Sequence, residues 1–371
     1  MRYVCLFTLL VGWCPLLVSA QTTQPGEAID VVNASRVTLD LKGVAPKAAF
    51  AQLAGQSGMF LRPYPPNLWE SREWGTVDLS VKDVSFWTAV RELCDKTGLS
   101  LQRIGMERDL YLMQGGNRAF GGYPTSEHGP FLVVAQLLER IHQVDLTRGR
   151  EPERRCDLRF VLYAEPRITI VKGDSRITII EGVDENGRKL TPSAAVAVSS
   201  AQAVRTWMWA MSAGLTLPEG AGQKIASLKG AVRLQVQTRS LRVEFDDVLT
   251  QKDVVRTVAG RKVVFKEAKK AGTETYTVQI EVHRDPGKPA EWNDIDLYST
   301  FRMKDAEGKS LTRRNPGGRG AGGSGVMNIV LTFGRESWAG GAGEPAKLVW
   351  DMPLETGEIE VPFEFSDLPM P

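Results

Sequence analysis

Two stretches of the chain repeat one pattern at a spacing of 40 residues, and this repeat constrains the fold more than any other feature. Residues 37–61 read VTLDLKGVAPKAAFAQLAGQSGMFL, and residues 77–101 read VDLSVKDVSFWTAVRELCDKTGLSL; they align without a gap. The matched pairs are Val37/Val77, Leu39/Leu79, Lys42/Lys82, Val44/Val84, Ala49/Ala89, Leu53/Leu93, Gly58/Gly98 and Leu61/Leu101. A unit this short cannot bury its own apolar face, so the repeat predicts that both units share one core.

Each unit predicts a strand, a helix and a second strand. Residues 37–41 alternate apolar and polar side chains, as a strand with one buried face does. Apolar residues then follow at helical spacing, and Gly58 and Gly98 stand where a helix ends in a left-handed cap. A further strand is predicted over 109–114. We therefore expect a small α+β domain, built from a βαβ repeat, over residues 36–114.

The repeated pattern V-x-L-x-x-K-x-V-x-x-x-x-A-x-x-x-L-x-x-x-x-G-x-x-L resembles the short N-terminal domain of secretins and TonB-dependent receptors. The resemblance covers about a fifth of the chain. It implies a periplasmic, non-catalytic module that docks partner proteins. The pore region of the secretins and the barrel of the receptors have no counterpart in the sequence, so the resemblance implies neither channel function.

The remainder of the chain predicts antiparallel β-structure. Residues 115–130 are rich in Gly and Pro and indicate a linker. Beyond them, short runs of alternating apolar residues are separated by turn signals, Asn186-Gly187 among them, which is typical of Ig-like β-sandwiches. We expect two such domains, over 131–225 and 226–371.

A weaker echo supports the idea of two related β domains. Residues 184–191 read DENGRKLT and residues 305–312 read DAEGKSLT, each after an alternating run. The shared pattern lacks the spaced oxygen ligands and the distal Glu of a calcium-binding EF-hand. We interpret both segments as hairpin turns.

Two further segments resemble a known group of proteins. The C-terminal stretch WDMPLETGEIEVPFEFSDLPMP is similar to the ending of uncharacterised exported proteins of planctomycete-type bacteria, and GPFLVVAQLLERIHQVDL is similar to another segment of them. The resemblance implies export and no reaction.

The first 20 residues predict a secretory signal peptide. Arg2 is followed by an uncharged apolar run, and Val18-Ser19-Ala20 gives the small-x-small pattern of a cleavage site. Residues 21–35 are then an N-terminal linker. No later stretch is apolar enough to span a bilayer, so we expect a periplasmic or extracellular protein with no transmembrane segment after cleavage.

Cleavage would leave two cysteines, Cys94 and Cys156. In an oxidising compartment they can form one disulfide that closes a long loop. The alternative is that each is a separate buried thiol, because a free cysteine packs as a small hydrophobe. The sequence leaves both alternatives open.

Aromatic residues are the candidate binding residues. Tyr64, Trp69 and Trp74 lie between the two repeat units in RPYPPNLWESREWG. They can form a platform for a glycan or a peptide, or they can cover the open edge of the small sheet.

The sequence offers little for catalysis or for cofactor binding. The three His are isolated from one another, and no nucleophile elbow, zincin motif or P-loop is present. Lys and Arg total 46 against 44 Asp and Glu, a net charge of +2, which argues against nucleic acid as a partner. We therefore expect no catalytic residues, no metal and no cofactor.

Two functions remain as hypotheses. The first is a non-enzymatic envelope protein that docks a protein partner and uses its β domains as a scaffold. The alternative is a protein that binds or cleaves a cell-surface glycan. Burial of Trp69, Trp74, Trp207 and Trp209 would favour the first function, whereas an exposed coplanar row would favour the second.

Overall fold

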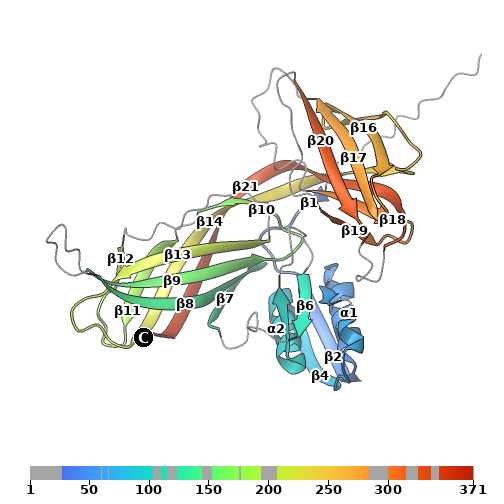
Figure 1. Ribbon diagram of the computed structural model, residues 1–371. Coiled ribbons are helices and arrows are strands. Elements are labelled where there is room, and N and C mark those ends of the chain that lie inside the picture. The colour runs from blue at the N-terminus through green and yellow to red at the C-terminus, as the bar shows by residue number, and fades with distance from the viewer. Residues whose placement is uncertain are drawn as a thin grey trace, which may run out of the picture.

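The computed structural model shows a chain that is mostly β-strand, with two α-helices among the residues it describes (Figure 1). The structure describes residues 27–59, 61–65, 67–102, 110–114, 123–143, 153–174, 177–193, 207–283, 300–314, 325–335 and 342–370. Figure 1 shows three parts: a module at the N-terminus that holds both helices, a middle β body and a distal β body. The predicted signal peptide and its cleavage site lie outside the described residues.

The N-terminal module follows the predicted repeat element by element. Its elements are β2 (Arg36–Val44), α1 (Pro46–Ser57), β3 (Leu61–Tyr64), the short 3-10 helix η1 (Leu68–Glu70), β4 (Val77–Ser85), α2 (Phe86–Thr97), β5 (Leu99–Gln102) and β6 (Leu110–Gln114). Both helices end at the predicted glycines, because Gly58 and Gly98 have φ angles of 68° and 67°. A left-handed backbone conformation is free of steric strain only for glycine, so these two residues determine where the helices end.

The module contains two small sheets around one core. β2 pairs antiparallel with β4, and β6 lies between β3 and β5. The alternating residues Val37, Leu39 and Leu41 are each about 1% exposed, so the predicted face of β2 is the buried one. The same core includes Phe50 and Leu53 of α1.

The middle β body places two layers of strands around one core. Its own strands are β7 (Thr125–His128), β8 (Phe131–Gln143), β9 (Glu153–Ala164), β10 (Ile170–Gly173), β11 (Thr178–Asp184), β12 (Thr191–Ser193) and β13 (Met208–Thr216). One layer has the order β12-β13-β9-β8-β7, and in the other β10 and β11 pair with the long strand β14 (Lys224–Asp246). Apolar residues of both layers meet in the core.

The distal β body repeats this strand order. Its own strands are β15 (Val254–Val258), β16 (Arg261–Lys270), β17 (Thr275–His283), β18 (Phe301–Asp305), β19 (Ser310–Arg313) and β20 (Val326–Gly334). They run in the order β19-β20-β17-β16-β15, and β18 pairs with the second long strand, β21 (Pro345–Pro369). The two bodies are therefore built on one plan, as the weak sequence echo indicated.

The echo residues form the same turn in both bodies, which confirms the hairpin interpretation. In the middle body the Asp184 carboxylate accepts from the backbone N–H of Arg188 at 2.7 Å and of Gly222 at 2.9 Å. In the distal body Asp305 accepts from Lys309 and Gly343, both at 2.7 Å. Burial acts to raise the pKa of each carboxyl, but these N–H donors hold the pKa of Asp184 and Asp305 below the ordinary value. A charged carboxylate thus ties each turn to a segment 38 residues later.

The two bodies share their longest strands. β14 and β21 pair antiparallel from Lys224 opposite Pro369 to Asp246 opposite Lys347, with a register shift near Gln237 (Figure 1). The first part of β14 and the last part of β21 pack in the middle core, and their other parts pack in the distal core. The second half of β14 therefore belongs to the distal body, and the second half of β21 belongs to the middle body.

This sharing corrects the predicted boundary at 225/226. That position falls inside β14, and the last residues of the chain, from Val361 onward, belong to the middle body. Local alternation predicted each strand segment, but it carries no information on which core a segment joins.

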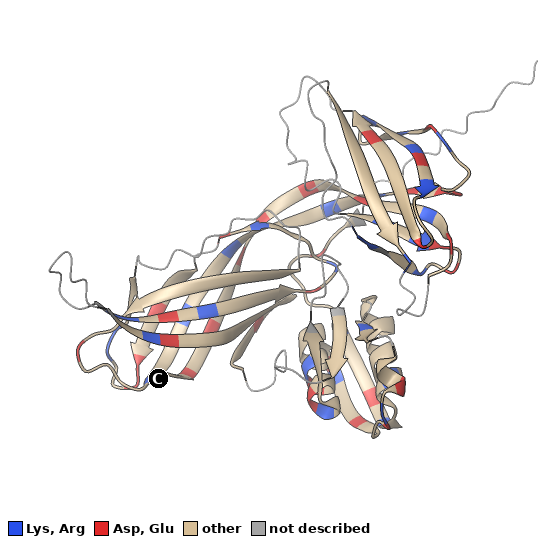
Figure 2. Cartoon of the chain, in the orientation of Figure 1, with Lys and Arg blue, Asp and Glu red and all other residues tan. Residues whose placement is uncertain are grey.

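Cross-strand ion pairs follow this shared ladder, and their side chains are exposed except that of Asp351, which is 10% exposed. They are Lys229–Glu364 (3.4 Å), Arg233–Glu360 (3.3 Å), Arg239–Glu355 (3.1 Å), Arg242–Asp351 (3.0 Å) and Glu244–Lys347 (2.7 Å). Figure 2 shows both signs of charge interspersed along β14 and β21. Exposed pairs of this kind contribute little stability.

Both predicted linkers contain a β-strand. Of residues 21–35, the first six lie outside the described residues, whereas β1 (Glu27–Ala28) pairs with β14 at Arg239 and Ser240. Of residues 115–130, the part up to 122 lies outside them, and β7 then forms an edge of the middle body. Both segments read as linkers because they are short and polar, yet the neighbouring sheets supply their hydrogen-bond partners.

Candidate functional site

Helix α2 attaches the N-terminal module to the middle β body. Trp87 is fully buried, and its indole N–H donates to the carbonyl of Pro130 at 3.0 Å. Its ring lies 6.0 Å from that of Tyr163, which stacks on Trp207 at 5.8 Å. Leu132 and Val134 of β8 complete this contact, so one apolar cluster runs from the module into the middle body.

A half-buried acidic contact accompanies the apolar one. Glu127 of β7 accepts from the hydroxyl of Ser85 at 2.5 Å, from Thr88 at 3.0 Å and from Arg91 at 3.2 Å. Ser85 is also the N-cap of α2, because its hydroxyl accepts from the backbone N–H of Thr88. The N-terminus of α2 therefore faces the Glu127 carboxylate of the middle body, and the helix dipole favours a negative charge at this end.

The segment before β2 forms a second attachment. Ser35 donates to the Glu165 carboxylate through its backbone N–H at 2.8 Å and through its hydroxyl at 2.7 Å. Arg167 donates to the same carboxylate at 2.6 Å and to the carbonyl of Asn33 at 2.5 Å. Glu165 is fully buried and has a cationic partner, which is how a buried carboxylate is tolerated.

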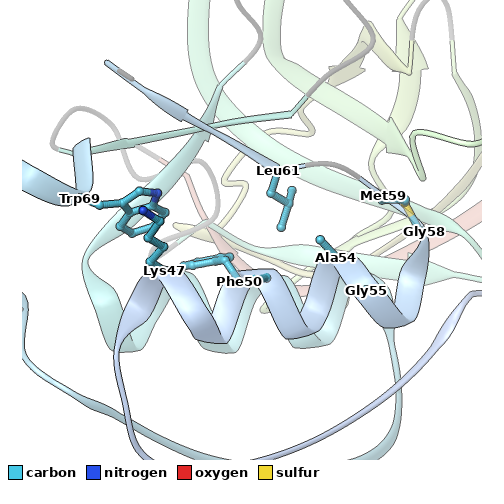
Figure 3. A pocket seen from close by; sticks show the side chains of 9 residues that line it. Lys47, Phe50, Ala54, Gly55, Gly58, Met59, Leu61 and Trp69 are labelled. Carbon is cyan, nitrogen blue, oxygen red and sulfur yellow. The ribbon is translucent and has the colours of Figure 1, made fainter. Parts of the chain in front are cut away.

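The other helix of the module borders an open groove. This α1 groove lies between α1 and β3 and has a volume of about 590 Å³. Its lining residues are Lys47, Phe50, Ala51, Ala54, Gly55, Gly58, Met59, Leu61 and Trp69. Figure 3 shows Lys47 and Trp69 at one end, Gly58 and Met59 at the other, and Leu61 above the helix. The lining is apolar apart from Lys47, whose ammonium lies 3.9 Å from the Glu70 carboxylate.

The repeat explains why α1 has a groove and α2 does not. At equivalent positions α1 carries Lys47, Ala51, Ala54 and Gly55, whereas α2 carries Trp87, Arg91, Cys94 and Asp95. Trp87 and Arg91 reach the middle body, and Cys94 packs in the core of the module, whereas Asp95 is exposed. The small side chains of Ala51, Ala54 and Gly55 leave space open beside α1, and this space is the groove.

The predicted aromatic residues do not form one platform. Trp69 lines the groove, with its ring 6.3 Å from that of Phe50. Trp74 packs behind Trp69 at 5.6 Å with ring planes at 60°, and it donates to the carbonyl of Leu68 at 3.2 Å. Tyr64 contacts Tyr111 at 6.3 Å and is not among the groove residues. The platform hypothesis missed Lys47 and the small residues of α1, which only the comparison of the two repeat units could have revealed.

Of the two alternatives that the sequence leaves open for Cys94 and Cys156, the structure shows two separate buried thiols and no disulfide between them. Cys94 packs in the core of the module, whereas Cys156 on β9 packs in the core of the middle body. Burial raises the pKa of the Cys94 thiol strongly and that of the Cys156 thiol to about 12. Both cysteines serve as small core residues in separate cores.

Neither thiol should react with iodoacetamide in the native protein at neutral pH, because burial and the raised pKa suppress the thiolate. Both should be alkylated after denaturation without a reducing agent, as measured by peptide mass spectrometry. Resistance to alkylation in the denatured, unreduced protein would contradict the expectation, since it would indicate a disulfide.

The histidines stay apart. His128 and His142 are exposed on β7 and β8, and His283 lies on β17 with Glu281 at 3.9 Å. Within the described ranges, no three His, Cys, Asp or Glu side chains come together as metal ligands would. Neither described helix has the length and apolar character needed to cross a bilayer.

Comparison with known proteins gives little further information. No protein-family model matches the chain, and no curated protein matches it. Among solved structures, the crystal structure of the conserved domain protein from Bacillus anthracis is similar at 10% identity and a TM-score of 0.21. That match covers 68% of this chain and 95% of the other one, and its low TM-score carries no argument about fold or function.

Proposed function

We propose that this protein is an exported, non-enzymatic scaffold of the cell envelope that presents its N-terminal module to a protein partner. The observation that carries the proposal is the α1 groove. The module is fixed to the middle body through α2 and Ser35, and the groove lies on the helix that these attachments do not use. An apolar hollow of this kind is the usual form of a recognition site.

The sequence resemblance supports the same function. The strand–helix–strand units resemble the short N-terminal domain of secretins and TonB-dependent receptors, which implies a periplasmic docking module. The predicted signal peptide agrees with that compartment. In this proposal residues 36–114 are such a module, and the two β bodies are Ig-like sandwiches.

The β bodies suit a scaffold because of how they are joined. Two paired strands run through both bodies, so the joint is a hydrogen-bonded ladder. Such a joint restrains the distance and the direction between the bodies more than a flexible linker would. We infer that the bodies act as a spacer that holds the module at a defined place.

A glycan partner receives less support. Sugar-binding platforms use exposed aromatic rings in a common plane, whereas Trp69 and Trp74 are half-buried with planes at 60°. Trp207 and Trp209 are 3% and 6% exposed. These tryptophans therefore contribute to cores, which favours the scaffold over the glycan function.

Photo-cross-linking in living cells tests the proposal. A benzoylphenylalanine at position 51 should give an adduct with one envelope protein, because Ala51 is an exposed residue of the groove. The same group at position 92 is the matched control, since Glu92 is exposed on α2. Addition of the Trp69→Ala substitution should abolish the adduct from position 51. The absence of any adduct from groove positions, or an adduct that Trp69→Ala leaves intact, would overturn the proposal.

A further inference from the structure

We propose that the outer face of the distal β body holds a binding site for a phosphate monoester group, formed by Arg242, Arg302 and Lys304. This cationic site lies outside the α1 groove and does not depend on the docking function proposed above. Its side chains come from neighbouring strands, because β14 and β18 both pair with β21. The site gives the scaffold a contact for a small anionic ligand.

The alternation of the strands places these side chains on one face. On β18, Phe301 and Met303 pack in the distal core. Arg302 and Lys304 alternate with them, so their side chains point to the outer face. Arg242 of β14 alternates with core residues in the same way. A ligand can reach the two guanidinium groups, because the side chains of Arg242 and Arg302 are 62% and 39% exposed.

Asp351 of β21 holds the two arginines next to each other. Its carboxylate accepts from Arg242 at 3.0 Å and from Arg302, which reach it from the strands on either side of β21. The Asp351 side chain is 10% exposed, so it orients the guanidinium groups from below. A guanidinium group has five N–H donors in one plane, so an arginine that donates to a carboxylate can also donate to an oxyanion.

Lys304 occupies an electrostatically unfavourable position. It lies directly opposite Lys347 in the pairing of β18 with β21, and like charges opposite each other destabilise a sheet. The residue is half-buried, and it forms no ion pair within the part of the chain that the structure describes. Burial lowers the pKa of Lys304, and the charges of Arg302 and Arg242 lower it further. A bound anion would supply the negative charge that this lysine lacks.

The charge balance selects the class of anion. The cationic site carries three positive charges, and Asp351 supplies one negative charge among them. The neighbouring carboxylates of Glu244 and Asp246 are both in ion pairs with Lys347, at 2.7 Å and 3.1 Å. An excess of two positive charges remains at the site, which matches a phosphate monoester at neutral pH. A carboxylate or a phosphodiester carries one charge and would balance the excess only in part.

Calorimetric titration with inorganic phosphate tests the site in the purified full-length protein. The unaltered protein should bind one phosphate per chain in a buffer that contains sodium chloride, which screens unspecific attraction. Lys304→Gln should weaken this binding about tenfold, because it removes one charged donor. Lys262→Gln is the matched control and should leave the binding unchanged, since Lys262 is exposed on β16, which pairs with β15 and β17.

Thermal unfolding separates binding from a purely structural role of Lys304. In chloride, Lys304→Gln should unfold at a temperature no lower than the unaltered protein, because it removes the like charge opposite Lys347. When phosphate replaces chloride at equal ionic strength, the unfolding temperature should rise more for the unaltered protein and Lys262→Gln than for Lys304→Gln. The general effect of phosphate as a salt is common to all three proteins. A loss of stability in chloride, with an equal rise in phosphate, would show that Lys304 only stabilises the sheet.

Vesicles distinguish the source of the phosphate. If the ligand is a lipid headgroup, the unaltered protein should sediment with phosphatidylcholine vesicles that contain phosphatidic acid, whereas Lys304→Gln should not. Binding of inorganic phosphate without binding to these vesicles would identify a soluble phosphate ester. The inference is overturned if the unaltered protein does not bind inorganic phosphate, or if Lys304→Gln binds it equally well.

Discussion

Replacing Trp87 with alanine should lower the free energy of unfolding of the N-terminal module by about 3–5 kcal/mol. The substitution removes a fully buried indole between α2 and the middle body, together with one of the two donors to the Pro130 carbonyl, which keeps the backbone N–H of Glu165 at 2.9 Å. Urea unfolding followed by helical circular dichroism measures the effect, because α1 and α2 are the helices in the described part of the chain.

The repeat supplies a matched control for this experiment. Lys47 occupies the equivalent position of α1, and its side chain is 67% exposed. Lys47→Ala should therefore change the free energy of unfolding by less than about 0.5 kcal/mol. Trp87→Phe should fall between the two, since it keeps a ring against Tyr163 but loses the N–H. A loss of less than about 1 kcal/mol for Trp87→Ala would contradict a tightly attached module.

Two phenylalanines in the shared strands should destabilise different bodies when they are replaced by alanine. Phe363 lies in the middle core against Phe160 at 5.5 Å, and Phe245 lies in the distal core against Phe265 at 5.3 Å. Each substitution should cost about 3–5 kcal/mol. Amide hydrogen exchange should rise in β8, β9 and β13 for Phe363→Ala, and in β16, β17 and β20 for Phe245→Ala.

The crossed pattern is the informative result. Phe245 and Phe363 both fall within 226–371, so a division of the β region into consecutive domains would place their effects in the same strands. The two variants serve as controls for each other, since both remove a buried ring. Val255 is 53% exposed, so Val255→Ala should leave amide hydrogen exchange in both bodies close to that of the unaltered protein. Increased exchange in the same strands for both phenylalanine variants would contradict the shared arrangement.

The sequence predicts local structure well wherever the signal is local. The 40-residue repeat indicated β2 to β5 and both α-helices of the module, and Gly58 and Gly98 ended the helices as predicted. The alternation over 109–114 indicated β6, whereas no signal indicated the 3-10 helix η1. The hairpin turns at Asp184 and Asp305 were also predictable, because a turn depends on a few neighbouring residues. Alternation likewise located parts of β14, at 232–236 and 241–245, and the last part of β21, at 359–365.

Long-range pairing was not predictable in the same way. Alternation identifies a buried face without naming its partner, so it could not show that Val361 and Val232 face each other while Trp350 joins another core. The sequence could not decide between a disulfide and two separate thiols for the same reason, because two cysteines in a sequence give no distance between them. The groove could have been predicted only by comparing the two repeat units, because Lys47 stands in one unit where Trp87 stands in the other.

The shared strands also determine the order in which the chain can fold as it is made. The distal core is complete once Met352 is available, because all its buried residues lie between Leu241 and Met352. The middle core begins more than a hundred residues earlier at Phe131, yet it needs Val361 to Met370. The body that comes first in the sequence therefore closes last, and until then its apolar sheet faces lack part of their cover. A chain arrested before Val361 would hold a folded distal body beside an aggregation-prone middle one.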